Sequence, residues 1–211
     1  MVRDGYRFAL PLFALAVIAA VVRWPLTCGV LLLATAFVVF FFRDPERLPP
    51  SDPAAVVSPA DGRVMEVVSE SWNGRAGRRI SIFLAIWNVH VNRAPMAGRV
   101  ERVEYRPGRF FGAMRSRASA ENEQNVIHLE TAQGKIVFKQ IAGLIARRIV
   151  FRKKPGDSVA AGERVGLIKF GSRVDVLFGP EWEIVVRPGM RVAGGSSIIA
   201  RRVDPGQPHG A

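Results

Sequence analysis

The stretch "LIKFGSRVDVLFGP", Leu167–Pro180, contains two apolar runs separated by Gly-Ser-Arg. Leu167–Phe170 and Val174–Phe178 are rich in Val, Leu, Ile and Phe, which predicts two buried β-strands. A hairpin turn at Gly171-Ser172 is the simplest explanation of the break between them. The alternative is that chemistry takes place on this peptide bond, because glycine lets a nucleophile approach its carbonyl without hindrance from a Cβ.

Short β-rich runs of the same kind alternate with Gly and Pro from residue 56 onward, which predicts a mainly β (α+β) domain over residues 56–204, built as a sandwich or barrel. The runs are "RVMEVV", "RRISIFLAIW", "RVERVEY", "NVIHLET", "KIVFKQI", "RRIVF", "RVGLIKF", "RVDVLF", "WEIVV" and "SIIARR". The segment "FFGAMRSRASAENE" has room for one turn of helix.

Two pairs of phrases in this β-rich region echo each other imperfectly. "SPADGRVMEV" resembles "APMAGRVERV", and "KPGDSVAAGERVGLI" resembles "RPGMRVAGGSSIIA". Such turn-plus-strand phrases are similar to those of lipoyl and biotinyl domains and their hybrid-barrel relatives. We therefore expect a hybrid-barrel-like fold, which by itself does not decide the function.

The N-terminal residues 1–43 hold two nearly uncharged runs, Phe8–Val22 and Leu26–Phe42. Each is slightly shorter than the about 20 residues of a spanning helix, and we interpret the pair as a membrane-embedded helical hairpin. Two buried core helices are the alternative. Basic residues are more numerous at each end of the hairpin than in the connection between its helices. This bias weakly favours a cytoplasmic location for both ends of the hairpin. Residues 44–55 form a proline-rich linker.

The net charge of +12 favours an anionic partner such as a membrane surface, an acidic substrate or nucleic acid. Cys28 is the only cysteine, and the three histidines lack metal-ligand spacing, so we expect no disulfide and no metal site. No helix-turn-helix, zinc finger or aromatic-basic repeat supports a nucleic-acid binder.

A serine that follows glycine between buried strands has a defined chemical possibility. If Ser172 Oγ attacks the Gly171 carbonyl, the amide becomes an ester. Elimination from that ester leaves a dehydroalanine, which hydrolyses to a pyruvoyl group and ammonia. A pyruvoyl group forms a Schiff base with an amine and acts as an electron sink. Gly-Ser alone is weak support for this chemistry, and the chain contains a second Gly-Ser in "AGGSS", Ala193–Ser197.

Seven phrases in order along the chain resemble the phosphatidylserine decarboxylase family, specifically its short, membrane-anchored branch. They are "FFRDPER", "SPADGRV", "NVHVNRAP", "ENEQN", "KQIAGLIARRIV", "GERVGLIKFGSRVDVLF" and "GMRVAGGSSIIA". Together they cover nearly the whole chain, which is far more specific than any single motif.

This resemblance implies self-cleavage between Gly171 and Ser172 into a large chain, 1–171, and a small chain, 172–211, which stay associated. It implies a pyruvoyl cofactor made from Ser172 that removes CO2 from the serine headgroup of phosphatidylserine. The expected partner is an anionic phospholipid in the inner cell membrane, with the catalytic domain in the cytoplasm. Archaetidylserine as the lipid and a homodimeric state stay open, and residues 205–211 are expected to form a flexible tail.

The resemblance assigns further catalytic roles. Asp61 in "PADG" matches the aspartate of the self-cleavage relay, although an Asp-Gly turn alone would explain it. His90 in "NVHVNRAP" matches the first family histidine and is the best proton shuttle. Arg93 stands where longer relatives carry the relay histidine. Either His90 therefore performs both tasks, or Arg93 stabilises an oxyanion while another group removes the proton.

Basic residues that suit phosphate or carboxylate include Arg147, Arg148 and Arg117, which we expect to bind substrate. A solvated basic face is the simpler explanation for any one of them. His128 is expected to be a half-exposed strand residue, and His209 lies in the polar tail.

Two non-enzymatic classes compete with this interpretation. A membrane-anchored adaptor with lipoyl-like halves would need a long coiled-coil hairpin between them, and no such pattern separates Val67 from Lys154. A lipoylated or biotinylated carrier would use Lys169, whose neighbours differ from the usual ones.

Overall fold

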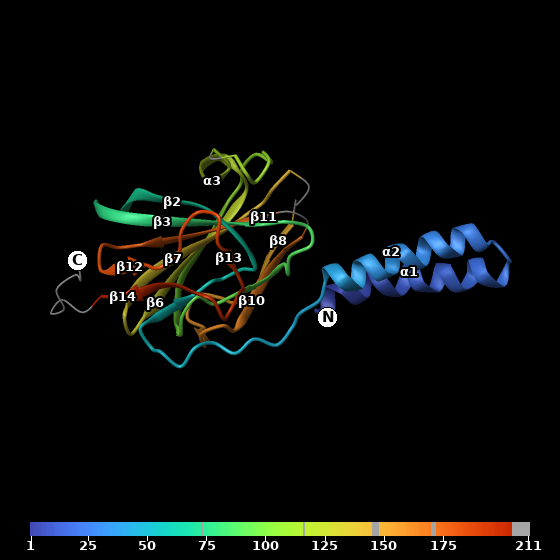
Figure 1. The fold of residues 1–211 in the computed structure, drawn as a ribbon, viewed down its shortest axis with the longest axis horizontal. Helices are drawn as coiled ribbons and strands as arrows, with labels where there is room; N and C mark the ends of the chain where they lie inside the picture. The colour runs from blue at the N-terminus through green and yellow to red at the C-terminus, as the bar shows by residue number, and fades with distance from the viewer. Residues whose placement is uncertain (73, 116, 145–147, 170–171, 204–211) are drawn as a thin grey trace. The chain divides into compact units, whose positions relative to one another are not determined.

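The computed structural model describes residues 1–203 except 73, 116, 145–147 and 170–171. By its contacts the chain divides into two compact units, Met1–Glu46 and Arg47–Ala211. The first is helical and the second is almost entirely β (Figure 1). The predicted fold class, mainly β with an N-terminal pair of apolar helices, is confirmed.

The helical unit consists of α1 (Arg3–Val21) and α2 (Pro25–Phe41), packed on each other. The helices run antiparallel, because the Val2 N–H at the start of α1 donates to the Phe42 carbonyl just after α2, at 3.0 Å. The buried α1 residues are all small, namely Gly5, Ala9, Ala16 and Ala19. Small residues let two helix backbones approach closely.

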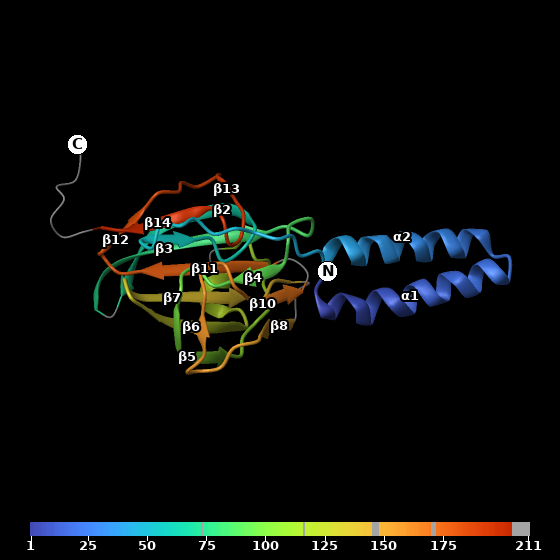
Figure 2. The same cartoon turned by 90° about the horizontal axis from the view of Figure 1, so that it is seen from below.

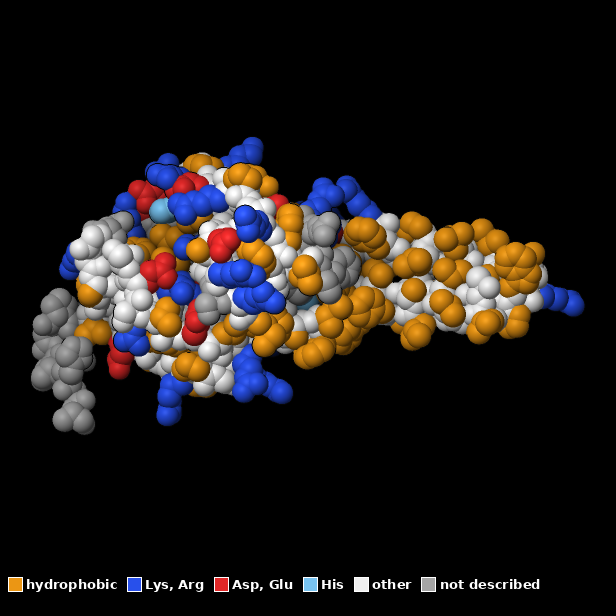
Figure 3. All heavy atoms as spheres, turned by 90° about the horizontal axis from the view of Figure 1, so that it is seen from above, with side chains coloured by type: hydrophobic (Ala, Val, Ile, Leu, Met, Phe, Trp, Pro, Cys, Tyr) orange, Lys and Arg blue, Asp and Glu red, His pale blue; other side chains and the backbone are white. Residues whose placement is uncertain are grey.

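Large apolar side chains cover the outside of this helix pair, as Figure 3 shows for one face. The helix α1 is long and apolar enough to cross a membrane, whereas α2 is shorter at 17 residues. Apolar surface that faces water is costly. The helix pair therefore suggests association with a membrane.

Deleting Met1–Phe42 is expected to leave a folded β unit that no longer sediments with membranes. The β unit has its own buried core, described below, so its folding should not require the helices. The measurement is membrane fractionation of both forms, together with the thermal unfolding of the truncated chain. An insoluble truncated chain without cooperative unfolding would contradict this expectation.

The β unit is built on one large curled sheet and two small ones. The large sheet has the strand order β13-β2-β3-β11-β7-β6-β5-β9, with antiparallel neighbours, and Figure 2 shows β3, β11, β7, β6 and β5 in succession. Its strands are β2 (Gly62–Trp72), β3 (Arg75–Leu84), β5 (Gly98–Arg106), β6 (Gln124–Thr131), β7 (Gly134–Ile141), β9 (Ser158–Val159), β11 (Ser172–Phe178) and β13 (Arg191–Val192). The short helix α3 (Ala118–Glu121) lies between β5 and β6, where the sequence predicted a helical turn.

The two small sheets have three antiparallel strands each. One has the order β4-β10-β8, and the other β1-β14-β12. Their strands are β4 (Val91–Arg93), β8 (Arg148–Phe151), β10 (Arg164–Lys169), β1 (Ala55–Val57), β12 (Trp182–Ile184) and β14 (Ile198–Arg202). Each of the ten β-rich runs predicted from the sequence contributes a strand.

The main core lies between these sheets and is made of aliphatic and aromatic side chains from most strands. Its largest fully buried members are Ile80, Ile82, Ile127, Leu129, Ile136, Phe138 and Phe178. A smaller cluster joins Ala60, Leu84, Ile168 and Val174. Because side chains alternate across a strand, Ser172 shares a face of β11 with Val174 and Val176, whereas Arg173 and Asp175 lie on the opposite face.

The two runs around Gly171-Ser172 do not form a hairpin. The strand β10 pairs with β4 and β8, whereas β11 pairs with β3 and β7. The chain therefore passes from a small sheet into the middle of the large one between Lys169 and Ser172. The hairpin explanation of this break is wrong, because the two strands belong to different sheets.

Candidate active site

Ser172 is the first residue of β11 and is completely buried. It stands opposite Leu84, the last residue of β3. Within the described ranges its Oγ makes no hydrogen bond, although the atom is shielded from water. An unpaired buried hydroxyl costs about 1–3 kcal/mol. This cost is unusual for a structural serine and favours a chemical role. Gly171 lies outside the described residues.

Asp61 stands just before β2 and holds two separate segments together. Its Oδ1 accepts from the Gly194 N–H at 2.7 Å, and its Oδ2 accepts from Arg47 Nη2 at 3.1 Å. The side chain is 15% exposed. Ala60, its neighbour, belongs to the same small cluster as Leu84 and Val174, which flank Ser172 in the sheet. Asp61 therefore forms an ion pair and a backbone hydrogen bond next to a residue that packs against the neighbours of Ser172.

His90 is buried at 2% exposure and lies beside β10. Its backbone carbonyl accepts from the Ile168 N–H at 3.3 Å. Its ring Nδ1 donates to the Asn88 carbonyl at 2.9 Å. A hydrogen on Nδ1 makes Nε2 the nitrogen with a lone pair, which is the atom that takes up or delivers a proton.

Arg93 is buried at 4% exposure at the end of β4. Its Nη1 donates to the Gly162 carbonyl at 3.0 Å, and its backbone N–H donates to the Pro59 carbonyl at 2.9 Å. A Cβ at Gly195 would lie 2.6 Å from Arg93 Cδ, so the arginine packs directly against that glycine. Arg93 therefore connects the segment before Asp61 with the turn whose Gly194 binds Asp61.

The second Gly-Ser of the chain lies in this turn. Gly195 has φ +78°, a left-handed conformation that favours glycine. The Ser197 Oγ accepts from the Ala193 N–H at 2.9 Å, which closes the turn. The two Gly-Ser sequences thus differ in environment, since Ser172 begins a buried strand and Ser196 belongs to a hydrogen-bonded turn.

Comparison with known proteins places the chain in a family. The model for phosphatidylserine decarboxylase matches residues 34–200. The phosphatidylserine decarboxylase proenzyme of Solibacter usitatus is 54% identical over 204 residues, which cover 97% of this chain and 98% of that protein. The proenzyme of Geotalea uraniireducens is 45% identical, with 93% of each chain covered. The chain belongs to the phosphatidylserine decarboxylase family.

Membership makes the chain an enzyme, and the names of its relatives support phosphatidylserine decarboxylase activity. The structure also counts against the carrier class. A modified lysine must reach solvent at a turn, whereas Lys169 is 8% exposed at the end of the central strand β10.

Two of the three substrate arginines expected in this phosphatidylserine decarboxylase family member lie among the described residues, and both are exposed. Arg117 is exposed, and its guanidinium stacks over the Phe111 ring at 3.9 Å. Arg148 is exposed at the start of β8, opposite Lys169. Arg147 lies outside the described residues. A role for these arginines in substrate binding stays a prediction.

A buried ionic cluster occupies the opposite face of β11, immediately after Ser172. Arg173 Nε donates to Asp175 Oδ1 at 2.6 Å, and both side chains are completely buried. Arg173 Nη2 donates to Glu66 Oε1 at 2.5 Å and to Ser81 Oγ at 2.6 Å. Ser119 of α3 donates to Asp175 Oδ2. The cluster ties β11 to β2, β3 and the segment that contains α3.

Arg79 supplies the second positive charge of this cluster. Its Nη1 lies 2.8 Å from Glu66 Oε1 and 3.5 Å from Asp175 Oδ2. Burial lowers the pKa of Arg79, but the charge of Asp175 and the hydrogen bond to Glu66 outweigh it and raise the pKa above its ordinary value. Burial raises the pKa of Glu66, yet hydrogen bonds from Arg79 and Arg173 hold it below its ordinary value. Both pKa shifts favour the charged forms of Arg79 and Glu66.

Asp175→Ala is expected to destabilise the protein by about 3–5 kcal/mol, because it removes the completely buried ion-pair partner of Arg173 and one of the counter-charges of Arg79. The measurement is denaturant unfolding followed by tryptophan fluorescence. Glu101→Ala is the matched control, because Glu101 pairs with Lys135 on an exposed strand surface and exposed pairs contribute little. Equal losses of unfolding free energy in the two variants would contradict the expectation that the buried ion pair contributes more than the exposed one.

Arg173 and Asp175 were not predicted from the sequence to be functional residues. A signal was present, because "RVDV" places two charges at alternate positions of an otherwise apolar run. The partners were not visible, since Glu66 and Ser81 belong to other strands.

A pocket of about 670 Å³ is lined in part by residues that adjoin the candidate residues in the chain or in the sheet. Gly62 follows Asp61, Ala85 follows Leu84, the strand partner of Ser172, and the Asn88 carbonyl accepts from the His90 ring. We call it the β2–β13 pocket. Its lining residues are Gly62, Arg63, Phe83, Ala85, Trp87, Asn88, Met114, Gly189, Arg191, Val192, Ala193 and Ser197.

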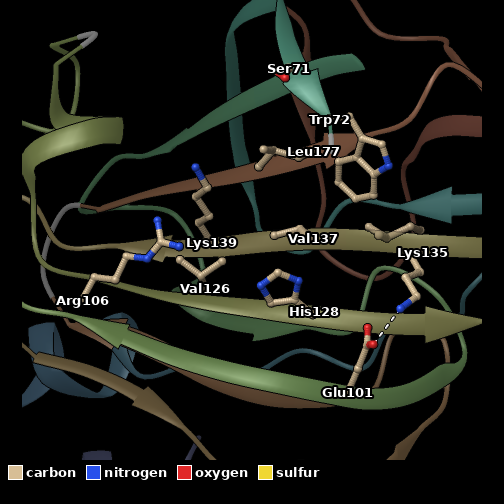
Figure 4. A pocket seen from close by; sticks show the side chains of 11 residues that line it. Ser71, Trp72, Glu101, Arg106, Val126, His128, Lys135, Val137, Lys139 and Leu177 are labelled. Atoms are coloured by element: carbon tan, nitrogen blue, oxygen red, sulfur yellow. Dashed lines mark hydrogen bonds and ion pairs between the residues drawn. The ribbon is translucent and has the colours of Figure 1, made fainter. Parts of the chain in front are cut away.

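A smaller pocket of about 190 Å³ lies on the β11–β7–β6 face of the large sheet and contains none of the predicted site residues (Figure 4). His128 is half-buried there, as predicted. Burial, with the charge of Arg102, lowers the pKa of His128 below its ordinary value. The Lys135 ammonium in this pocket is already paired with Glu101 at 2.6 Å.

Proposed function

We propose that this chain is a proenzyme that cleaves its own Gly171–Ser172 bond and then decarboxylates phosphatidylserine to phosphatidylethanolamine with a pyruvoyl group derived from Ser172. The observation that carries the proposal is the buried Ser172 Oγ, which has no hydrogen-bond partner in the described part of the chain. Membership of the phosphatidylserine decarboxylase family supports the activity itself.

Self-cleavage begins when Ser172 Oγ attacks the Gly171 carbonyl carbon and the amide becomes an ester, with the proton passing to the Ser172 nitrogen. Removal of the Ser172 Cα proton then expels the Gly171 carboxylate and leaves a dehydroalanine. Water adds to the resulting imine tautomer and releases ammonia, which completes the pyruvoyl group. The base for these steps must lie close to Ser172, and Asp61 and His90 are the candidates.

The surroundings of Ser172 fit a pyruvoyl group. A ketone carbonyl carries no O–H, so conversion of the side chain removes the donor that is otherwise buried without a partner. The neighbours on the same face, Leu84 and Val174, are fully buried and apolar and exclude water. The pyruvoyl group would supply an electrophilic carbonyl that accepts the electron pair released with CO2.

The two chains made by cleavage have reason to stay together. The strand β11 would begin the small chain, and it lies between β3 and β7 of the large chain. The small-chain strands β13 and β14 pair with β2 and β1 of the large chain. Separation would break backbone ladders and expose core residues such as Val176 and Phe178.

His90 is the residue that we assign to proton transfer during turnover. Its Nδ1–H is held by the Asn88 carbonyl, so Nε2 is the atom that delivers the proton replacing CO2 on the substrate Cα. The buried position keeps water from competing. Arg93, with its Nη1 on the Gly162 carbonyl, is better suited to hold the neighbouring backbone segments than to abstract a proton.

The anionic partner that we propose is phosphatidylserine in a membrane, to which α1 and α2 would anchor the enzyme. The decisive experiment incubates purified full-length protein with phosphatidylserine in detergent micelles and measures CO2 and phosphatidylethanolamine. We expect two polypeptides on a denaturing gel, of which the smaller resists N-terminal sequencing because a pyruvoyl group has no amine. A single active chain with a free N-terminal amine would contradict the pyruvoyl mechanism, and the absence of product would contradict the activity.

A further inference from the structure

The β2–β13 pocket carries positive charge without an adjacent carboxylate. Two of its lining residues are the arginines Arg63 and Arg191, and none is Asp or Glu. Among the residues that the structure describes, neither arginine forms an ion pair, and the one hydrogen bond recorded for their side chains runs from Arg63 Nε to the Gly189 carbonyl, at 3.1 Å. The nearby carboxylate of Asp61 is already bound by Arg47 and the Gly194 N–H.

The two arginines are direct cross-strand neighbours. The β2–β13 register places Arg63 opposite Arg191, so both side chains leave the sheet on the same face. Like charges directly opposite each other destabilise an antiparallel pair. The register is nevertheless fixed, because Val64 N–H donates to the Met190 carbonyl and Gly189 N–H donates to Val64. Such a fixed pair of guanidinium groups is suited to hold one anion between them.

The rim of the β2–β13 pocket carries large apolar side chains. Trp87 and Met114 are each 67% exposed, and Phe83 contributes a half-buried aromatic ring. A tryptophan at a pocket mouth suits the boundary between water and lipid, where its apolar body and polar N–H are both satisfied. Cationic walls combined with an apolar rim favour an anionic lipid over a free phosphate.

The pocket also adjoins the segments that carry the candidate residues. Its lining includes Gly62, the chain neighbour of Asp61, and Asn88, whose carbonyl binds the His90 ring. In a serine phospholipid only a CH2 group and one oxygen separate the phosphorus from the Cα that loses CO2. Arg63 stands opposite Phe83, and Phe83 stands opposite Arg173, so the two guanidinium groups lie on the sheet face opposite that of Ser172. Because β3 ends at Leu84 and β11 begins at Ser172, a headgroup whose phosphate is held there reaches the candidate catalytic residues around the end of the sheet.

We propose that Arg63 and Arg191 form the phosphodiester-binding site for the phospholipid substrate. This inference rests on the proposed function and adds the residues that recognise the headgroup. The substrate phosphate bridges the two guanidinium groups, and the acyl chains leave past Trp87 and Met114 toward the bilayer. These arginines are positioned differently from Arg117 and Arg148, which do not line this pocket.

The test compares full-length Arg63→Gln, Arg191→Gln and the double variant with Arg75→Gln. Arg75 is the matched control, because it is equally exposed and lies at the opposite end of β3 from Leu84. We expect each pocket variant to raise the KM for phosphatidylserine in neutral detergent micelles about tenfold. The kcat should stay within about twofold of wild type and chain cleavage should be complete, because neither side chain is assigned to the chemistry. Arg75→Gln should match the wild type.

The soluble substrate glycerophosphoserine and inorganic phosphate separate the possible ligands. We expect the pocket variants to raise the KM for glycerophosphoserine as well, since it keeps the phosphodiester without acyl chains. Inorganic phosphate should compete with it in the wild type and much less in the double variant. An unchanged KM for phosphatidylserine in the double variant would overturn the proposal, even if inorganic phosphate still competed, because the site would then take free phosphate only. An equal rise in Arg75→Gln would also overturn it, by showing a general charge effect.

The same preparations also test whether the variants fold and whether the proposed function holds. The Arg191 side chain makes no hydrogen bond in the described ranges, so its replacement tests recognition even if Arg63→Gln weakens the Gly189 contact. An Arg191→Gln enzyme that is fully cleaved and has wild-type KM would refute the inference alone. A wild-type protein that releases no CO2 from phosphatidylserine would instead refute the proposed function.

Discussion

Ser172→Ala is expected to give a single uncleaved chain of 211 residues without decarboxylase activity. Alanine lacks the hydroxyl that attacks the Gly171 carbonyl, so neither the ester nor the pyruvoyl group forms. The substitution should not unfold the protein, because the Oγ makes no hydrogen bond in the described part of the chain and the site is enclosed by Leu84 and Val174. The measurements are a denaturing gel, CO2 release and thermal unfolding.

The turn at Ala193–Ser197 provides the control for this variant. Ser196→Ala and Ser197→Ala should both be cleaved normally, although Ser197→Ala loses the hydrogen bond from the Ala193 N–H and some stability with it. Two chains from Ser172→Ala would refute the assignment of the cleavage site. One chain from Ser196→Ala with normal cleavage in Ser172→Ala would move that site to the turn.

His90→Ala is expected to lower turnover per pyruvoyl group by about 10²–10⁴-fold, the usual contribution of a positioned general acid. The substitution removes the imidazole that the Asn88 carbonyl orients, and a water molecule would replace it poorly. The measurement is CO2 release from the cleaved fraction of the variant, normalised to its pyruvoyl content. This normalisation separates turnover from any effect of His90 on chain cleavage.

A matched comparison for His90 is His128→Ala, which replaces a half-buried histidine on β6 in the pocket of Figure 4. That variant should retain activity, because His128 lies among Val126, Val137 and Lys135 and none of these residues is assigned to the reaction. Activity of His90→Ala within threefold of wild type would eliminate it as the proton donor and leave Asp61 or a bound water molecule as the candidates.

The sequence determined the local structure of this protein well. Two uninterrupted apolar runs gave α1 and α2, because a helix satisfies its backbone hydrogen bonds within one segment. The β-rich runs became strands because β-branched and aromatic residues suit an extended chain between turn residues. The segment "FFGAMRSRASAENE" was also predicted to have room for one helical turn, and it contains α3. All of these depend on neighbours within a few residues.

The candidate catalytic residues were also named from the sequence, but through resemblance to a family rather than through pattern. Asp61 alone is compatible with a simple Asp-Gly turn, and His90 alone with a hydrogen-bonded core residue. The seven phrases in their order along the chain distinguished these alternatives, since no single phrase carries the same specificity. Family membership is now shown over nearly the whole chain, whereas the individual residue roles stay predictions.

Only the tertiary structure decided which strands are neighbours. The runs on either side of Gly171-Ser172 are close in sequence and yet belong to different sheets, which excludes a hairpin. Strand pairing depends on register between distant segments, and an isolated apolar run carries little information about its partner. The same limit hid the contact between Arg173 and Glu66, which are 107 residues apart. It also hid the pairing of Arg63 with Arg191, because a charge on one strand acquires its meaning from the side chain that the folded sheet places opposite it.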